Sequence, residues 1–144
     1  MLKLFPSVDS HAGAKGALKA GVFGCLAFEA MLGLGLIVTY FLGISPIDKA
    51  AIKPDEALAQ FIGVLLEAVI VLIALLRFRA NKGLIWGGFV FAIFALECFA
   101  KIVGGTANVG WLIVYIAIGA SLINGIRGAW AMRYLNPELN DTFS

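Results

Sequence analysis

The chain has 144 residues, of which 61% are hydrophobic and only 14% are charged. Soluble domains are about 45–50% apolar and about 25% charged, and a domain of this size buries only about two thirds of its surface. The composition therefore excludes a soluble fold and indicates lipid as the main solvent. The net charge of +2 is too small to indicate nucleic-acid binding.

The amino-terminal segment lacks the sustained apolar run of a cleavable signal peptide, because Lys3 is soon followed by polar residues. Asp9 or Ser10 is suited to cap a helix that runs through Lys15 and Lys19 into the first apolar segment. We interpret this segment as a surface-lying leader that positions the first membrane span.

Four apolar segments follow, at about 20–43, 56–76, 84–103 and 109–131. Each has about the 20 residues that a helix needs to cross a bilayer. Pro54 suits the first position of the second helix, and Trp111 and Trp130 lie at the two ends of the fourth, as in an aromatic belt. The sequence predicts an all-α polytopic membrane protein, with residues 1–144 forming a single domain in which four transmembrane helices make an up-down bundle.

Basic residues predict the orientation of this bundle. One side carries most of them, namely Lys3, Lys15, Lys19, Arg77, Arg79, Lys82, Arg127 and Arg133. The opposite side has Lys49 and Lys53, with Lys101 just before its second loop. Since an even number of crossings places both termini together, the positive-inside rule predicts that both are cytoplasmic. We expect a location in a bacterial cytoplasmic (inner) membrane.

Three glutamates interrupt the apolar segments. Glu29 and Glu67 fall near the middle of a hydrocarbon core about 30 Å thick, and Glu97 falls in its outer half. Lys101 lies one helical turn beyond Glu97, which is the favourable order for an ion pair. A charged side chain at the bilayer centre costs about 2.5–3.5 kcal/mol. We therefore expect these carboxyls to share a site, to be protonated, or both, and the four residues are candidates for ligand or proton binding.

A structural role explains the same residues equally well, because a protonated glutamate can hydrogen-bond to a neighbouring helix. One face of the second segment carries Gln60, Gly63 and Glu67 at helical spacing. This pattern indicates a face that packs against another helix and hydrogen-bonds to it through its polar side chains. In the fourth segment small residues repeat every four positions, a pattern that lets helices approach closely. The candidates for helix contacts are Gln60, Gly63, Ser121, Asn124, Gly125 and Ala129.

Residues for several kinds of chemistry are missing from the spans. His11 is the only histidine and lies outside them, which excludes paired-histidine haem ligation and the Glu-x-x-His motif of di-iron bundles. Cys25 and Cys98 do not form a Cys-x-x-Cys motif, and we expect both thiols to be free. No glycine-rich phosphate loop is present. We expect no enzyme activity, no catalytic residue, no metal and no cofactor.

Two hypotheses for the function remain. The sequence favours an accessory or structural membrane protein whose polar residues hold helices or a partner together. Its partners would be the lipid bilayer and a second copy or another membrane protein, and no nucleic acid. The alternative is a small proton- or cation-coupled channel or transporter, with Glu29 and Glu67 at its centre and Glu97 and Lys101 near its outer mouth.

Overall fold

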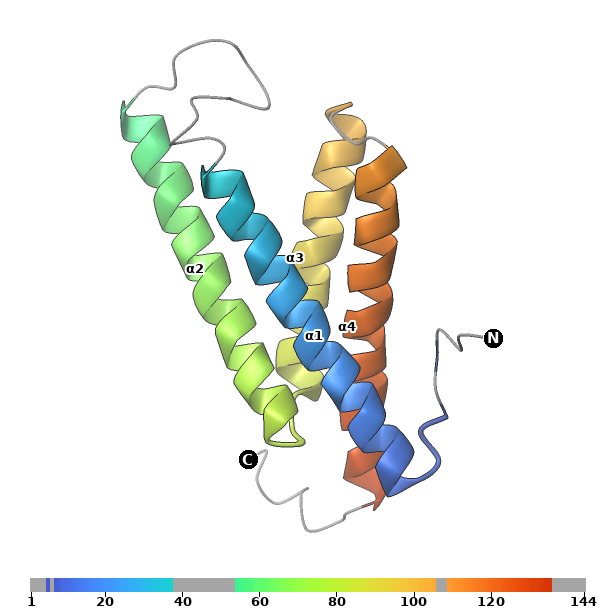
Figure 1. Cartoon of the computed structure of the whole chain (residues 1–144). Coiled ribbons are helices and arrows are strands. Elements are labelled where there is room, and N and C mark those ends of the chain that lie inside the picture. The colour runs from blue at the N-terminus through green and yellow to red at the C-terminus, as the bar shows by residue number, and fades with distance from the viewer. Residues whose placement is uncertain (1–4, 6, 38–53, 106–108, 136–144) are drawn as a thin grey trace.

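The computed structural model describes residues 5, 7–37, 54–105 and 109–135, and the regular structure in them is helical. Four helices follow one another along the chain (Figure 1): α1 (His11–Leu36), α2 (Pro54–Arg79), α3 (Leu84–Val103) and α4 (Val109–Leu135). All four are long and apolar enough to cross a membrane. The prediction of an all-α fold with four membrane-length helices is confirmed.

Three helices extend further than the apolar segments suggested. α1 begins at His11, so that the helix expected from a cap at Asp9 or Ser10 is continuous with the first span; the Ser10 hydroxyl accepts a hydrogen bond from the Gly13 amide (3.1 Å), and α1 contains no proline. α2 extends beyond residues 56–76 at both ends. α4 continues to Leu135, beyond residue 131. The last part of the first predicted span, residues 38–43, lies outside the described residues.

A tight turn joins α2 to α3. The Lys82 amide donates to the Arg77 carbonyl (2.8 Å) and the Asn81 amide donates to the Phe78 carbonyl (3.1 Å). Asn81 has a φ of 58°, a left-handed conformation that asparagine tolerates better than most residues. These features form a Schellman cap, which satisfies the last carbonyls of α2 and starts α3 beside it.

The closest packing in the bundle is between α1 and α4. A β-carbon added to Gly21 would lie 2.5 Å from the Gly125 Cα, and one added to Gly128 would lie 2.8 Å from the Ala14 carbonyl oxygen. The pairing of earlier α1 residues with later α4 residues makes these two helices antiparallel. Small residues at such contacts let helix backbones approach closely in a membrane.

One aromatic ring connects all four helices near the α2–α3 turn. Phe78 of α2 is buried, and a β-carbon added at Gly21, Gly83, Gly87 or Gly125 would lie within 3.2 Å of its ring. These four glycines, which we call the glycine socket, belong to α1, the turn, α3 and α4. Because they leave room for the ring, Phe78 fixes the spacing of the helices at this end.

The opposite end of the bundle is more open. In Figure 1 the α1–α2 pair diverges from the α3–α4 pair toward the end away from the α2–α3 turn. The first half of α2 is exposed on several sides, with Leu58, Leu65 and Leu66 each at least 56% exposed. Apolar side chains of this kind require lipid or another protein around them.

Candidate functional site

The three glutamates of the spans lie at one level of the bundle. Glu29, Glu67 and Glu97 belong to α1, α2 and α3. Counted from the glycine socket or Phe78 along each helix, they are roughly 8 to 11 residues away, or about 12 to 16 Å at 1.5 Å per residue. Each carboxyl therefore comes from a different helix, on the open side of the socket.

The same side chains share one electrostatic environment. Glu67 interacts electrostatically with Glu97, with Glu29 and with Lys101. All three glutamates are half-buried, as is Lys101. The structure thus brings together the four residues that the sequence singled out as candidates for ligand or proton binding. We call Glu29, Glu67, Glu97 and Lys101 the carboxylate cluster.

Lys101 links the cluster to the fourth helix. Its Nζ lies 2.5 Å from Glu97 Oε1, an ion pair one turn apart on α3. The same ammonium lies 5.1 Å from the ring centroid of Tyr115 and 6.0 Å from that of Trp111, both on α4. A cation over an aromatic face is attracted by the ring quadrupole. Glu97, Tyr115 and Trp111 therefore form a site for an ammonium group, and the Lys101 side chain occupies it.

Tyr115 and Trp111 were missed as members of the site. Trp111 was interpreted only as an aromatic residue of the membrane interface. The available signal was their spacing of four residues, which places both rings on one face of a helix. The two rings are stacked, with centroids 6.0 Å apart.

Two carboxyl oxygens of the cluster are buried without a donor. Glu67 Oε1 and Glu97 Oε2 have no hydrogen-bond partner in the described part of the chain. A buried polar atom that is left unpaired costs about 1–3 kcal/mol, and more when it is charged. Such atoms need a specific explanation. A proton on the carboxyl or a cation beside it would remove this cost.

An aromatic layer borders the cluster on the side of the glycine socket. Phe28 and Phe94 meet edge to face with ring centroids 5.3 Å apart, and Phe94 meets Tyr115 in the same way at 5.8 Å. Val71, Val90 and Leu122 form part of the buried apolar core. Among the described residues, Asn124 is the only buried polar one, and it lies next to the socket residue Gly125. The core on this side of the cluster is therefore dry.

The candidates for helix contacts on α4 occupy different environments. Gly125 belongs to the glycine socket and Ala129 is buried in the core. The Ser121 hydroxyl donates to a carbonyl one turn earlier in its own helix, at 2.8 Å. Asn124 is buried, and its Oδ1 accepts a hydrogen bond from Arg127 Nη1 at 3.2 Å. The structure thus places Gly125 at the α1–α4 contact and the Ser121 hydroxyl bond within α4.

The two candidates on α2 have no assigned contact. Gly63 is exposed, and no atom would lie within 4 Å of a β-carbon added to it. The side chain of Gln60 lies outside the described residues. Helix contacts at Gln60 and Gly63 therefore stay predictions. A second copy or another protein is one source of a contact at Gly63, because the described residues supply none.

The cluster does not have the form of a metal centre. Within residues 5, 7–37, 54–105 and 109–135, no three His, Cys, Asp or Glu side chains are grouped so that they could hold a metal ion. Cys25 and Cys98 are free thiols. The carboxylates are close enough to influence one another's charge, and this arrangement suits a proton, which needs one oxygen, better than a divalent metal, which needs several oxygen ligands.

The geometry of these residues is the available guide to the function. The chain matches no protein-family model, no curated protein and no solved structure. What it does must therefore be inferred from the carboxylate cluster and from the helices that carry it.

Proposed function

We propose that this chain is a polytopic membrane protein whose four helices cross a bacterial inner membrane as an up-down bundle with both termini in the cytoplasm. The length and hydropathy of the helices support the crossing. Seven of the described basic residues lie near the α2–α3 turn end: Lys15, Lys19, Arg77, Arg79, Lys82, Arg127 and Arg133. At the other end Lys101 is paired with Glu97. This asymmetry supports a cytoplasmic location for the turn end.

We further propose that the carboxylate cluster binds protons or small monovalent cations and that the protein carries them across the membrane. The observation that carries this proposal is the pair of buried oxygens, Glu67 Oε1 and Glu97 Oε2, for which the described part of the chain supplies no donor. A purely structural glutamate would be expected to hydrogen-bond to a neighbouring helix. Ionisable residues inside a membrane commonly mark ion pathways and proton relays.

The dry core supports a carrier in preference to an open channel. Buried apolar side chains separate the cluster from the turn end, namely Phe28, Phe94, Val71, Val90 and Leu122. An ion bound at the cluster would have to cross this apolar region to reach the cytoplasm. Loading from the open end and release toward the turn end would therefore require the helices to rearrange, as in alternating access.

Flux through reconstituted vesicles tests the proposal. Purified full-length protein is placed in vesicles, and the uptake of protons and of sodium or potassium is followed after a gradient is imposed. The wild type should show flux above that of protein-free vesicles. Glu67→Gln should reduce it at least tenfold, because the neutral amide takes up no proton and lacks the negative charge that attracts a cation. Ser121→Ala, a polar change outside the cluster, should leave the flux within twofold.

Two results would contradict carrier function. The first is the absence of flux for the wild type under every gradient. The second is Glu67→Gln protein that is folded and transports at the wild-type rate. Circular dichroism of the helices in the same vesicles establishes folding, so that a loss of flux is not mistaken for a loss of structure.

A second candidate function, an accessory protein that binds a membrane partner, rests on the exposed glycine of α2. Gly63 has open space around it, next to the exposed Leu65 and Leu66. Glycine at such a site lets another helix approach closely. Gly63→Leu should therefore weaken cross-linking to a second copy or a co-purifying membrane protein without lowering thermal stability. Unchanged cross-linking, or none in the wild type, would exclude this role.

A further inference from the structure

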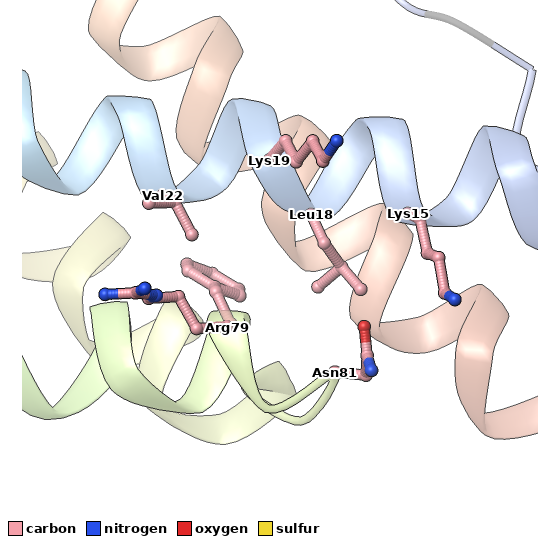
Figure 2. Close-up of a pocket in the computed structure, with 7 residues that line it drawn as sticks. Lys15, Leu18, Lys19, Val22, Arg79 and Asn81 are labelled. Atoms are coloured by element: carbon pink, nitrogen blue, oxygen red, sulfur yellow. The ribbon is translucent and has the colours of Figure 1, made fainter.

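A pocket of about 310 Å³ lies at the turn end of the bundle, away from the carboxylate cluster (Figure 2). The first turns of α1 form one wall, and the end of α2 with the following turn forms the other. Its lining consists of Lys15, Leu18, Lys19, Val22, Phe78, Arg79 and Asn81. No function proposed above uses this pocket.

The pocket has an apolar floor and a cationic rim. In Figure 2 Leu18 and Val22 point from α1 toward the end of α2. Together with Phe78, which also lines the pocket, they form its apolar floor. Lys15 extends across the opening toward the Asn81 side chain, and the guanidinium of Arg79 extends along the opposite side of the pocket. The two lining lysines and Arg79 are exposed. The three cations thus surround an apolar surface instead of covering it.

The charge on this rim is not neutralised by the described residues. The only ion pair within residues 5, 7–37, 54–105 and 109–135 joins Lys101 to Glu97, at the other end of the bundle. The side chains of Lys15, Lys19 and Arg79 form no hydrogen bond or ion pair within those residues. A pocket with three uncompensated cations is complementary to an anion such as a phosphate group, which Lys and Arg both bind well.

We propose that this pocket binds the phosphate group of an anionic phospholipid of the cytoplasmic leaflet. The cationic rim would hold the phosphate and the apolar floor would contact the glycerol and the first methylene groups. An inorganic phosphate would use the rim alone and leave the floor in water. The proposal goes beyond carrier or partner function and rests only on the placement of the turn end at the cytoplasmic surface.

The position of the pocket along the helix agrees with a headgroup site. Lys19 precedes Glu29 by roughly ten residues, or about 15 Å, which is half the thickness of a hydrocarbon core of about 30 Å. Basic pockets at the cytoplasmic ends of transmembrane helices are suited to acidic headgroups, and each cation that contacts the headgroup contributes about fivefold to the affinity. Three cations should together contribute about 100-fold.

Lipid retention measured by native mass spectrometry tests this site. The full-length protein is titrated in neutral detergent with phosphatidylglycerol and, separately, with phosphatidylcholine. The pocket variant carries Lys15→Gln, Lys19→Gln and Arg79→Gln. Its matched control carries Arg77→Gln, Lys82→Gln and Arg133→Gln, which remove the same charge from the same end of the bundle without touching the pocket.

The wild type should retain one phosphatidylglycerol far more tightly than phosphatidylcholine. The pocket variant should lose about 100-fold in affinity, and the control should lose no more than a few-fold, as expected for screened charges. Equal losses in the two triple variants would show diffuse attraction and overturn the proposal. Equal retention of the two lipids would also overturn it.

Two further measurements distinguish binding of a lipid from binding of free phosphate. Inorganic phosphate at 10 mM should not displace the bound lipid, and its displacement of the lipid would overturn the assignment to a phospholipid. Val22→Ser alters only the floor and should weaken lipid retention at least threefold. If the triple variant does not fold, the single changes Lys15→Gln and Arg79→Gln provide the test, with about fivefold losses expected. This assay measures no flux, so its failure is distinct from a failure of carrier function.

Discussion

The two ends of the bundle differ in how the helices meet. At the turn end, backbones approach closely around the ring of Phe78, and the α1–α4 contact leaves no room for a methyl group on Gly21. At the open end, side chains from all four helices surround a polar centre, and two buried carboxyl oxygens lack a partner. The interior of the turn end is closely packed and apolar, whereas the interior of the open end is loosely packed and contains charged side chains.

This difference suggests that the two ends have different roles: residues at the turn end stabilise the fold, and residues at the open end carry the candidate site. Tightly packed interiors lose stability when even a small group is added or removed. Sites that bind and release a ligand are drawn from the less stable parts of a protein. The comparison therefore predicts that substitutions near the glycine socket affect folding and that substitutions in the carboxylate cluster affect activity.

Removal of the ring from the socket should have the largest effect on stability. Phe78→Ala leaves a cavity where all four helices meet, and phenylalanine-to-alanine changes at buried sites cost about 3–5 kcal/mol. Unfolding of the protein in mixed micelles with increasing denaturing detergent measures this loss. Phe89→Ala on α3 is the control, because Phe89 is 58% exposed. Equal losses at the two positions would remove the distinction between the ends.

Adjacent glycines of α3 offer a sharper test. A β-carbon on Gly87 would overlap the ring of Phe78, whereas one on Gly88 meets nothing within 4 Å. Gly87→Ala should destabilise the protein by about 1–3 kcal/mol through overpacking. Gly88→Ala should leave stability equal or slightly higher, because alanine is the better helix former by about 1 kcal/mol. The same unfolding assay compares them, and a harmless Gly87→Ala would show that the socket is not tightly packed.

The smallest effect on stability is expected within the carboxylate cluster. Glu67→Gln removes no interhelical hydrogen bond that the described residues show, and its exchange of a carboxyl for an amide keeps the shape. We expect the free energy of unfolding to change by less than about 1 kcal/mol. A loss comparable with that of Phe78→Ala would instead assign Glu67 a structural role and favour the accessory hypothesis.

Different parts of this structure were accessible from the sequence for different reasons. The four helices follow from apolar runs long enough to cross a bilayer, and the cap at Ser10 follows from its side chain. The start of α1 at His11 agrees with the helix expected from that cap, which runs through Lys15 and Lys19 into the first span. The candidate site was visible because Glu29 and Glu67 interrupt those runs.

The glycine socket was not predictable in this way. The repeat of small residues predicts a helix contact at Gly125, but which helix it meets depends on the rotation and crossing of the helices. Neither its pairing with Gly21 nor the packing of Phe78 has a local signal. Phe78 is one of 11 phenylalanines, and its sequence neighbours do not distinguish it. The same reason explains why Tyr115 was missed, since an aromatic residue in a span is ordinary until Lys101 is found beside it.

The packing at the glycine socket also affects the position of the Glu67 carboxyl, which lies farther back along α2. Phe78 lies roughly 11 residues beyond Glu67 on one continuous helix, a lever arm of about 16 Å. A tilt of about 5° around the ring would displace the Glu67 carboxyl by about 1.4 Å, given that rise per residue. That shift exceeds the range of about 0.5 Å over which N–H···O hydrogen-bond lengths vary. The packing of Phe78 at the far end of α2 therefore influences the spacing of the carboxylates, although Phe78 itself does not belong to the carboxylate cluster.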